Sequence, residues 1–372
     1  MSTNARYVGP SVVDVLSLAA AAAWRDGNPT ITTGHMLAAL SRRSTMFKYW
    51  VGGHRKALRR MLWQEEVPGS YPDHTGPHQL LNVSQALQEA HWFARRILRK
   101  DREVAGPVWG EQTWLAMREA LESPDGAVST LNPAHLLAAL LTGDSNQAQR
   151  FLYERQINVS DALHSGGVPD QLSLDSPRLE SAAFRTASTG LTESDVPTLV
   201  HKVLRVRIRQ VWRLGPLSCI VGLEARRQAV RTGNRVSGLL HVLAAILELE
   251  AQLSSRRRAW RTEFASDNRA GEVLSRWGLQ HESVIRHVWF DRNSIPGDVD
   301  TARGWSKQWD PPMAQDVTTV LYRAEKLAAG DGRRFAGTVH VLRALLEEPT
   351  GSVLAFVANQ GINVVGVRNE LQ

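Results

Sequence analysis

Four histidines, whose imidazole side chains could do chemistry, recur at regular spacing along the sequence. Each opens a short apolar run, and the runs read GHMLAAL (34–40), AHLLAAL (134–140), LHVLAAI (240–246) and VHVLRAL (339–345). His35 and His135 are 100 residues apart, and His241 and His340 are 99 apart. Imidazoles could bind a metal or move protons. Their equivalent places at four separate helix starts instead favour a local hydrogen bond inside each repeat.

The other reactive side chains are isolated. His74 and His78 lie four residues apart in a Pro- and Gly-rich stretch, and the spacing indicates no third metal ligand. Cys219 is on the apolar face of an expected helix, where a cysteine packs as a small hydrophobe. Glu248 and Glu250 are two apart on an expected helix and point to different faces, with no base or nucleophile beside them. The sequence therefore predicts no enzyme, no bound metal and no cofactor.

Composition narrows the class of protein. The 372 residues are 43% hydrophobic, and this length is typical of about two or three domains. No apolar run reaches the roughly 18 residues of a membrane span, and the first residues lack the pattern of a secretory signal. The single cysteine excludes an internal disulfide. We therefore expect a cytoplasmic protein without a membrane partner.

The basic charge has two explanations. The net charge is +7, and Arg clusters occur at 205–213 and 256–261. They are better explained as solvated helix faces than as a nucleic-acid footprint, which would need the Arg side chains on one face. An Arg-rich nucleic-acid-associated regulatory protein stays as the alternative. Most of the twelve tryptophans are expected to pack in the core, while Trp305 and Trp309 are candidates for an exposed contact.

Helical periodicity runs along the whole chain, and strand signals are scarce. Apolar residues recur at helical spacing, for example at Val12, Leu16, Ala19 and Ala23. Thr32, Asn132 followed by Pro133, Gly238 and Gly337 are the expected N-caps of the four histidine helices. A stretch rich in Ser, Gly and Pro at 166–190 is the expected interdomain linker.

The histidine motif is part of a longer internal repeat. His35 and His241 are 206 residues apart, and His135 and His340 are 205 apart, so a unit of about 205 residues holding two repeats occurs twice. Each repeat has a helix, a turn, the histidine helix and a second half with further short helices. The second halves lie at 146–165, 268–289 and 351–372, with a degenerate copy at 45–63; an added helix is expected near 83–100.

This repeat resembles the N-terminal domain of the Clp unfoldases, the Clp repeat domain. The residues that carry the resemblance are the turns at 27–35, 233–241 and 332–340, each running from a glycine to the histidine, with a weaker match at 127–135. The resemblance covers nearly the whole chain. It implies an all-α fold of two tandem domains, 1–165 and 191–372, each a pseudo-twofold pair of helical repeats. No G-x-x-x-x-G-K-[ST] motif occurs anywhere in the sequence, so we expect none of the nucleotide-binding loops of a Clp motor in these residues.

The resemblance also implies where a ligand would bind. In the family a Glu before each histidine helps to bind phosphorylated arginine, but here those positions are Gly34, Ala134, Leu240 and Val339. The family groove between the repeats, where Clp-directed cyclic peptides bind, corresponds here to Val8, Pro10, Trp109, Leu214 and Met313. The implied function is non-enzymatic binding of a peptide or cyclic-peptide ligand, with Clp protease components as possible partners. Two forms are open: a Clp adaptor, or a decoy that sequesters Clp-directed cyclic-peptide antibiotics and gives resistance.

Overall fold

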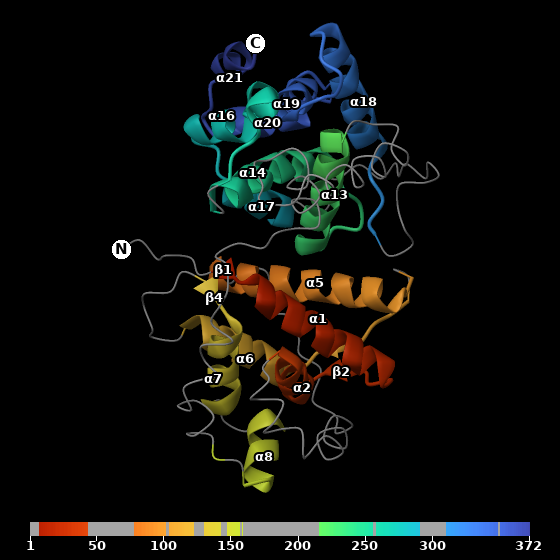
Figure 1. Ribbon diagram of the computed structural model, residues 1–372, viewed down its shortest axis with the longest axis vertical. Coiled ribbons are helices and arrows are strands. Elements are labelled where there is room, and N and C mark those ends of the chain that lie inside the picture. The colour runs from red at the N-terminus through yellow and green to blue at the C-terminus, as the bar shows by residue number, and fades with distance from the viewer. Residues whose placement is uncertain are drawn as a thin grey trace. The chain divides into compact units, whose positions relative to one another are not determined.

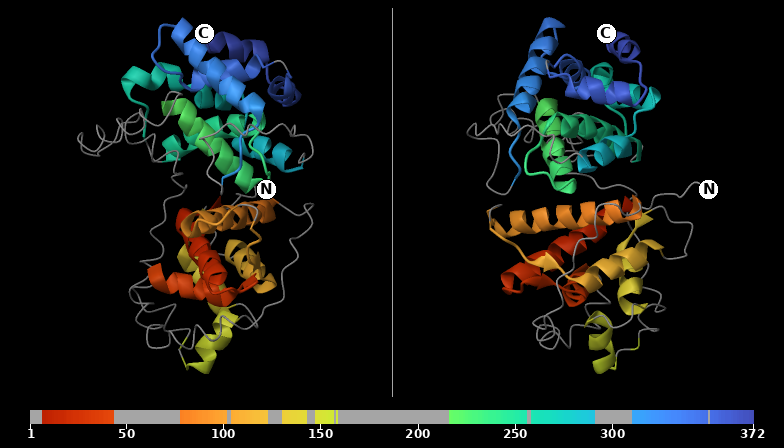
Figure 2. Two further views of the ribbon diagram at one scale, coloured as in Figure 1. Left: turned by 90° about the vertical axis from the view of Figure 1, so that its right-hand side faces the viewer. Right: turned by 180° about the vertical axis from the view of Figure 1, so that it is seen from behind.

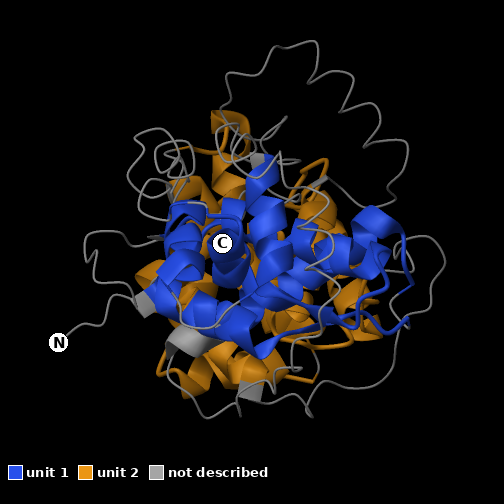
Figure 3. Ribbon diagram, turned by 90° about the horizontal axis from the view of Figure 1, so that it is seen from below, with its two compact units in different colours: residues 1–179 blue, residues 180–372 orange. Residues whose placement is uncertain are grey.

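The chain divides into two compact units with separate hydrophobic cores. Unit 1 comprises residues 1–179 and unit 2 residues 180–372 (Figure 3). The computed structural model describes residues 7–43, 78–101, 104–122, 130–142, 147–156, 158, 216–255, 258–290, 310–348 and 350–372. Within these ranges the fold is all-α, as predicted. The expected linker at 166–190 lies outside them.

Unit 1 is built on the long helices α1 and α5. Its elements are β1 (Tyr7–Val8), α1 (Pro10–Arg25), β2 (Thr30–Ile31), α2 (Thr33–Arg43), α5 (His78–Leu98), β3 (Val108–Trp109), α6 (Glu111–Glu122), β4 (Thr130–Leu131), α7 (Pro133–Thr142) and α8 (Gln147–Glu154). The predicted apolar stripe of α1, including Val12 and Leu16, is fully buried. Helix α5, the expected addition, lies beside α1 in all views (Figures 1 and 2).

Unit 2 is organised around α14, which packs against α13, α16 and α17. Its elements are α13 (Pro216–Arg231), α14 (Leu239–Ser255), α15 (Thr262–Ala265), a 3-10 turn (Ser266–Asn268), α16 (Ala270–Arg276), α17 (His281–Phe290), α18 (Gln315–Gly330), α19 (Thr338–Leu346), α20 (Ser352–Asn359) and α21 (Val364–Glu370). The second halves predicted for repeats three and four are confirmed as pairs of short helices.

Short parallel strands join the two repeats of unit 1, and periodicity did not indicate them. Strand β1 pairs with β4, and β2 pairs with β3, each over two residues. In unit 2 a single parallel bridge joins Ser237 to Met313. Two residues are too few to produce the alternation by which a strand is recognised in sequence. The strands precede helices, so they fix where those helices start.

The same turn precedes the histidine helix in repeats one, three and four. Gly27, Gly233 and Gly332 have positive φ angles of 73°, 71° and 71°. The amide after each glycine donates to a carbonyl five residues earlier: Asn28 to Ala23, Asn234 to Ala229 and Arg333 to Ala328, at 2.8–2.9 Å. This left-handed C-terminal turn ends the first helix and is favourable for glycine. Gly361, expected to end a helix in the same way, has φ 75°.

Several predicted features lie outside the described residues. These are His74, Leu214, Trp305, Trp309, the Arg cluster at 205–213 and the degenerate repeat segment at 45–63. His78 begins α5, but its side chain is not described. None of the described helices is both long and apolar enough to cross a membrane.

Candidate functional site

Each of the four repeat histidines accepts a hydrogen bond from the backbone three residues before it. The acceptor is Nδ1, and the donors are the amides of Thr32 (3.1 Å, to His35), Asn132 (3.2 Å, to His135), Gly238 (2.9 Å, to His241) and Gly337 (2.9 Å, to His340). A nitrogen that accepts carries no proton, so these rings are neutral with the proton on Nε2. This bond is one half of a capping box, with histidine replacing the usual Glu or Gln, and in repeats one and two the N-cap side chain supplies the other half. The predicted local role is confirmed.

The surroundings of His35, His241 and His340 favour the neutral form of these three rings. Burial lowers the pKa of His35 to about 4 and that of His241 to about 3. Nε2 of His241 is 3.1 Å from Thr232 Oγ1, an oxygen that can accept its proton. Nε2 of His340 instead faces the Asp331 carboxylate at 3.3 Å, while burial lowers its pKa. In His241 and His340 both ring nitrogens therefore have a partner in the turn.

The predicted N-caps also form as expected. Oδ1 of Asn132 accepts from the amides of Ala134 and His135 at 3.0 Å, and Pro133 is the first residue of α7. Oγ1 of Thr32 accepts from the His35 amide at 3.3 Å. These bonds satisfy amide groups that a helix start would otherwise leave unpaired.

Three of the predicted groove residues, Val8, Trp109 and Met313, lie at equivalent places, which we call the strand seams: β1 with β4, β2 with β3, and the Ser237–Met313 bridge. In each seam, the segment before the first helix of one repeat pairs with the segment before the histidine helix of the other. Val8 lies opposite Leu131, Trp109 opposite Ile31 and Met313 opposite Ser237. Pro10 begins α1. The Ser237–Met313 bridge of unit 2 is therefore the equivalent of the β2–β3 pair of unit 1.

The groove residues differ in exposure. Val8 is half-buried and Val108, beside Trp109, is 40% exposed, whereas Trp109 and Met313 are only 1% and 7% exposed. The terminal methyl of Met313 packs against Gly222 of α13, where an added Cβ would approach it to 2.6 Å. The exposed part of the described seams is therefore in unit 1, at Val8 and Val108.

The second halves of the repeats interlock across each unit. In unit 1 the Ala148 amide of α8, from repeat two, donates to Thr33 Oγ1 of α2, from repeat one, at 3.4 Å. In unit 2 the Ala270 amide of α16, from repeat three, donates to Thr338 Oγ1 of α19, from repeat four, at 3.3 Å. The threonine begins the histidine helix in both cases. This equivalence supports a pseudo-twofold relation between the repeats.

The positions that carry Glu in the resembling family are uncharged here and lie in the first turn of each histidine helix. Gly34 and Val339 are buried, and Ala134 and Leu240 are half-buried. A guanidinium or phosphoguanidinium ligand would gain no carboxylate partner from these positions. Among the described residues, no group of three His, Cys, Asp or Glu side chains could hold a metal ion.

A buried polar network in unit 2 was not predicted. Nη1 of Arg227 lies 2.8 Å from Glu224 Oε1 and 3.5 Å from Glu248 Oε1. Gln228 donates to Glu224 and Gln252 donates to Glu248, at 2.7 and 2.8 Å. Nε2 of His281 on α17 lies 3.3 Å from Gln228 Oε1. All six side chains are at most 9% exposed. The network ties α13, α14 and α17 together.

Two arginines outside the predicted clusters are buried. Arg226 and Arg227 on α13 are each 3% exposed. Burial lowers the pKa of Arg226, and the nearby Asp310 carboxylate opposes that shift. A charged side chain is buried only where partners compensate for lost hydration. Arg258 and Arg261, the described members of the second Arg cluster, are half-buried.

Cys219 and most of the described tryptophans pack in the core, as predicted. Cys219 is buried in α13, and burial raises the pKa of its thiol, which makes it a packing residue rather than a nucleophile. Five of the described tryptophans are buried: Trp92, Trp109, Trp114, Trp260 and Trp289.

Comparison with known proteins gives one family match. Residues 313–372 match the family model described as the Clp repeat (R) N-terminal domain. The match begins at Met313 in the unit 2 seam and includes α18 to α21. No curated protein and no solved structure matches the chain.

Proposed function

We propose that the whole chain is a non-enzymatic, Clp-related binding protein for peptides or proteins, and we base this on the match of residues 313–372 to the Clp repeat (R) N-terminal domain family model. The family assignment itself points to a Clp-related protein-interaction role. The proposal extends that role to the other three repeats. It also takes residues 1–165 and 191–372 as tandem domains with a linker at 166–190.

The main support for extending the family role to the other repeats is that repeats one and four make the same contacts. The family match covers repeat four, where Gly332, His340 and Thr338 make the turn, the cap and the contact with the neighbouring repeat. Repeat one makes the same three interactions through Gly27, His35 and Thr33. Equivalent interactions in the first and the fourth repeat support one fold for both units.

We place the ligand site at the strand seams, with Val8, Pro10, Trp109, Leu214 and Met313 as its residues. Val8 and Val108 supply apolar surface that a peptide side chain could cover. The uncharged residues before the four histidines favour an apolar or cyclic peptide over phosphoarginine. Such a site fits either a Clp adaptor or a decoy that sequesters Clp-directed cyclic peptides.

Two binding measurements test the function and separate its two forms. An adaptor would retain a Clp subunit in a pull-down with the full chain. A decoy would bind a Clp-directed cyclic peptide in calorimetry without retaining the subunit. Binding of neither the cyclic peptide nor a Clp subunit would refute the proposed function.

A matched pair of variants tests the place of binding. Val8→Thr keeps the side-chain shape but puts a hydroxyl in the unit 1 seam, and we expect it to weaken cyclic-peptide affinity by about tenfold. Val365→Thr is the control, because Val365 is 65% exposed on α21. Equal affinity for both variants, with unchanged circular dichroism, would remove the seam as the binding site.

A further inference from the structure

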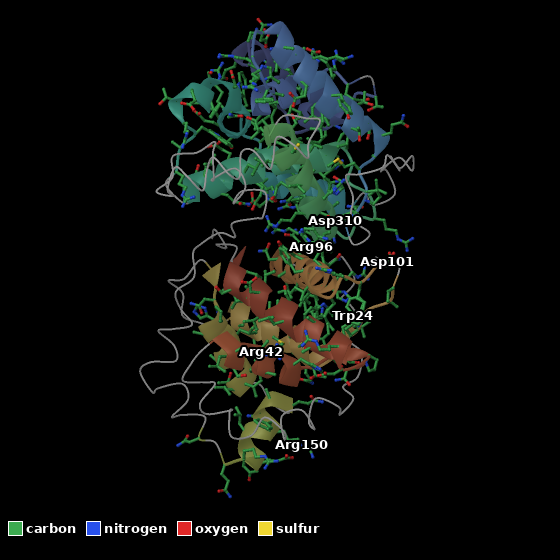
Figure 4. The ribbon with its side chains drawn as sticks, turned by 45° about the vertical axis from the view of Figure 1, so that its right-hand side comes forward. Trp24, Arg42, Arg96, Asp101, Arg150 and Asp310 are labelled. Carbon is green, nitrogen blue, oxygen red and sulfur yellow. The ribbon has the colours of Figure 1, made fainter. Side chains whose placement is uncertain are left out.

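The adjoining C-terminal ends of α1 and α5 carry the strongest concentration of basic side chains in the described part of unit 1. Its members are Arg25 at the end of α1, Arg95 and Arg96 in the last turn of α5, and Arg99 and Lys100 directly after it. Figure 4 shows Trp24, Arg96 and Asp101 at this end of the two helices. We call this surface the basic end.

Aromatic side chains hold two of these cations in place. The Arg95 guanidinium lies 5.6 Å from the Trp24 ring centroid, and that of Arg96 lies 4.7 Å from the Trp92 centroid. Trp24 also stacks at a tilt on His91 of α5, at 5.4 Å. Arg95 donates to the Val104 carbonyl at 3.3 Å, so the segment after α5 folds back beside the helix. Stacked guanidiniums are pre-positioned and lose little freedom on binding a partner.

The charge on this surface is poorly balanced. Arg25, Arg99 and Lys100 are exposed, and they make no ion pair with the described residues. Asp26 and Asp101, both half-buried, are the carboxylates adjoining the five cations in the described sequence. Helix dipoles favour cations at this end, which explains why they are tolerated. The five cations leave a positive surface, which complements a negatively charged partner.

Exposed aliphatic side chains beside the charges indicate the kind of partner. Ile97 is 53% exposed and Val104 is 43% exposed. Covering aliphatic surface contributes to binding a protein but adds little to binding a phosphate backbone. Arginine next to apolar anchors is typical of protein interfaces.

We propose that the basic end is a docking surface for an acidic segment of a protein partner that also carries apolar side chains. The surface is separate from the strand seams and does not depend on the peptide-binding function proposed for them. Ile97 and Val104 contact the apolar side chains of the partner, and Arg99 and Lys100 contact its carboxylates.

The test uses the full chain and defined probes. A fluorescein-labelled peptide of alternating Glu and Leu is titrated at low salt, beside a Glu–Ser peptide of equal length and a single-stranded oligonucleotide. We expect the Glu–Leu peptide to bind most tightly, and added salt to weaken its binding. Arg99→Glu with Lys100→Glu should weaken it by about tenfold or more, and Ile97→Ser by about threefold.

Matched control substitutions can be made at exposed residues elsewhere in unit 1. Arg42→Glu with Arg155→Glu makes the same charge change at exposed sites, and Tyr153→Ser removes an 85% exposed aromatic side chain. Both should leave the affinity unchanged, as should Val8→Thr in the seam. Failure of the Glu–Leu peptide to bind would overturn the proposal. So would oligonucleotide binding that depends on Arg99 and Lys100 but not on Ile97, since that result identifies a nucleic-acid surface.

Discussion

At the residue scale, the four histidines act as acceptors that complete a helix start. A side chain at this position must accept a bond from the N-cap amide and fill a buried space, and a neutral imidazole does both. The same motif in an unannotated sequence could be mistaken for a metal or catalytic site. Here His241 makes its bonds inside its own turn.

Replacing His241 separates the contribution of its hydrogen bond to the Gly238 amide from the contribution of its packing. His241→Ala should lower the free energy of unfolding by about 2–4 kcal/mol, because it leaves the Gly238 amide unpaired and opens a cavity. His241→Gln keeps an acceptor at this position and should cost less. Urea denaturation followed by circular dichroism measures both values. Equal losses for Ala and Gln would contradict a capping role.

Acid should destabilise the protein through these rings. The folded state holds the pKa of His35 at about 4, below its ordinary value of 6.5. The unfolded chain therefore binds more protons, and the stabilisation present above pH 6.5 is lost as the pH falls toward 4. The loss is on the order of 3 kcal/mol for this residue. Urea midpoints measured from pH 7 to pH 4.5 should fall, and His35→Gln should flatten the decline. A pH profile identical in the variant and the parent would show that His35 does not contribute.

At the element scale, helix ends decide the architecture. The left-handed glycine turn ends the first helix, two-residue strands align the repeats, and the histidine cap starts the next helix. The caps and turns could be predicted because glycine, histidine and N-cap residues recur at fixed spacing. The strands could not, because Thr30 and Ile31 carry no alternation that distinguishes them from a loop.

A glycine pair at the end of α18 tests the turn. Gly332 has φ 71° and no neighbour that a Cβ would touch, so Gly332→Ala should cost about 1–2 kcal/mol through backbone strain alone. Gly330 lies in the same helix end, also with open space, but without a positive φ. Gly330→Ala should be neutral or stabilising by up to about 1 kcal/mol. Thermal unfolding of both variants gives the comparison, and equal effects would argue against the left-handed turn.

The buried network distinguishes α13 from the corresponding helix of repeat one. At the positions equivalent to Glu224, Arg227 and Gln228, repeat one has Leu18, Ala21 and Ala22. Sequence reasoning missed the network because Glu and Arg on a helix are usually solvated, and only the packing of α14 and α17 over α13 buries them. The difference in residue type between repeats one and three was the one sequence signal that could have indicated the network.

Breaking this network should be more costly than replacing it. Arg227→Met leaves Glu224 and Glu248 without their shared cation and should lower stability by about 3–5 kcal/mol. Arg227→Met combined with Glu224→Leu and Glu248→Leu removes the uncompensated charges and should recover much of that loss. Chemical denaturation measures both. A triple variant less stable than Arg227→Met alone would contradict the account.

At the scale of the whole molecule, two separate cores carry the same repeat interactions. The spacing of the histidines predicted the repeat, and Thr33 and Thr338 show how the second halves interlock. Exposure of the seam residues could not be predicted, because equivalent positions hold a half-buried Val8 and a buried Trp109. A family resemblance locates a groove, but the side chains that line it decide what it binds.

Hydrogen–deuterium exchange of the full chain, with and without a Clp-directed cyclic peptide, tests the central claim most directly. If the chain is a tandem peptide-binding protein, the peptide should slow exchange at the strand seams, at residues 7–10 and 108–110 in unit 1 and 313–314 in unit 2. Unchanged exchange at all three seams in the presence of saturating peptide would contradict it.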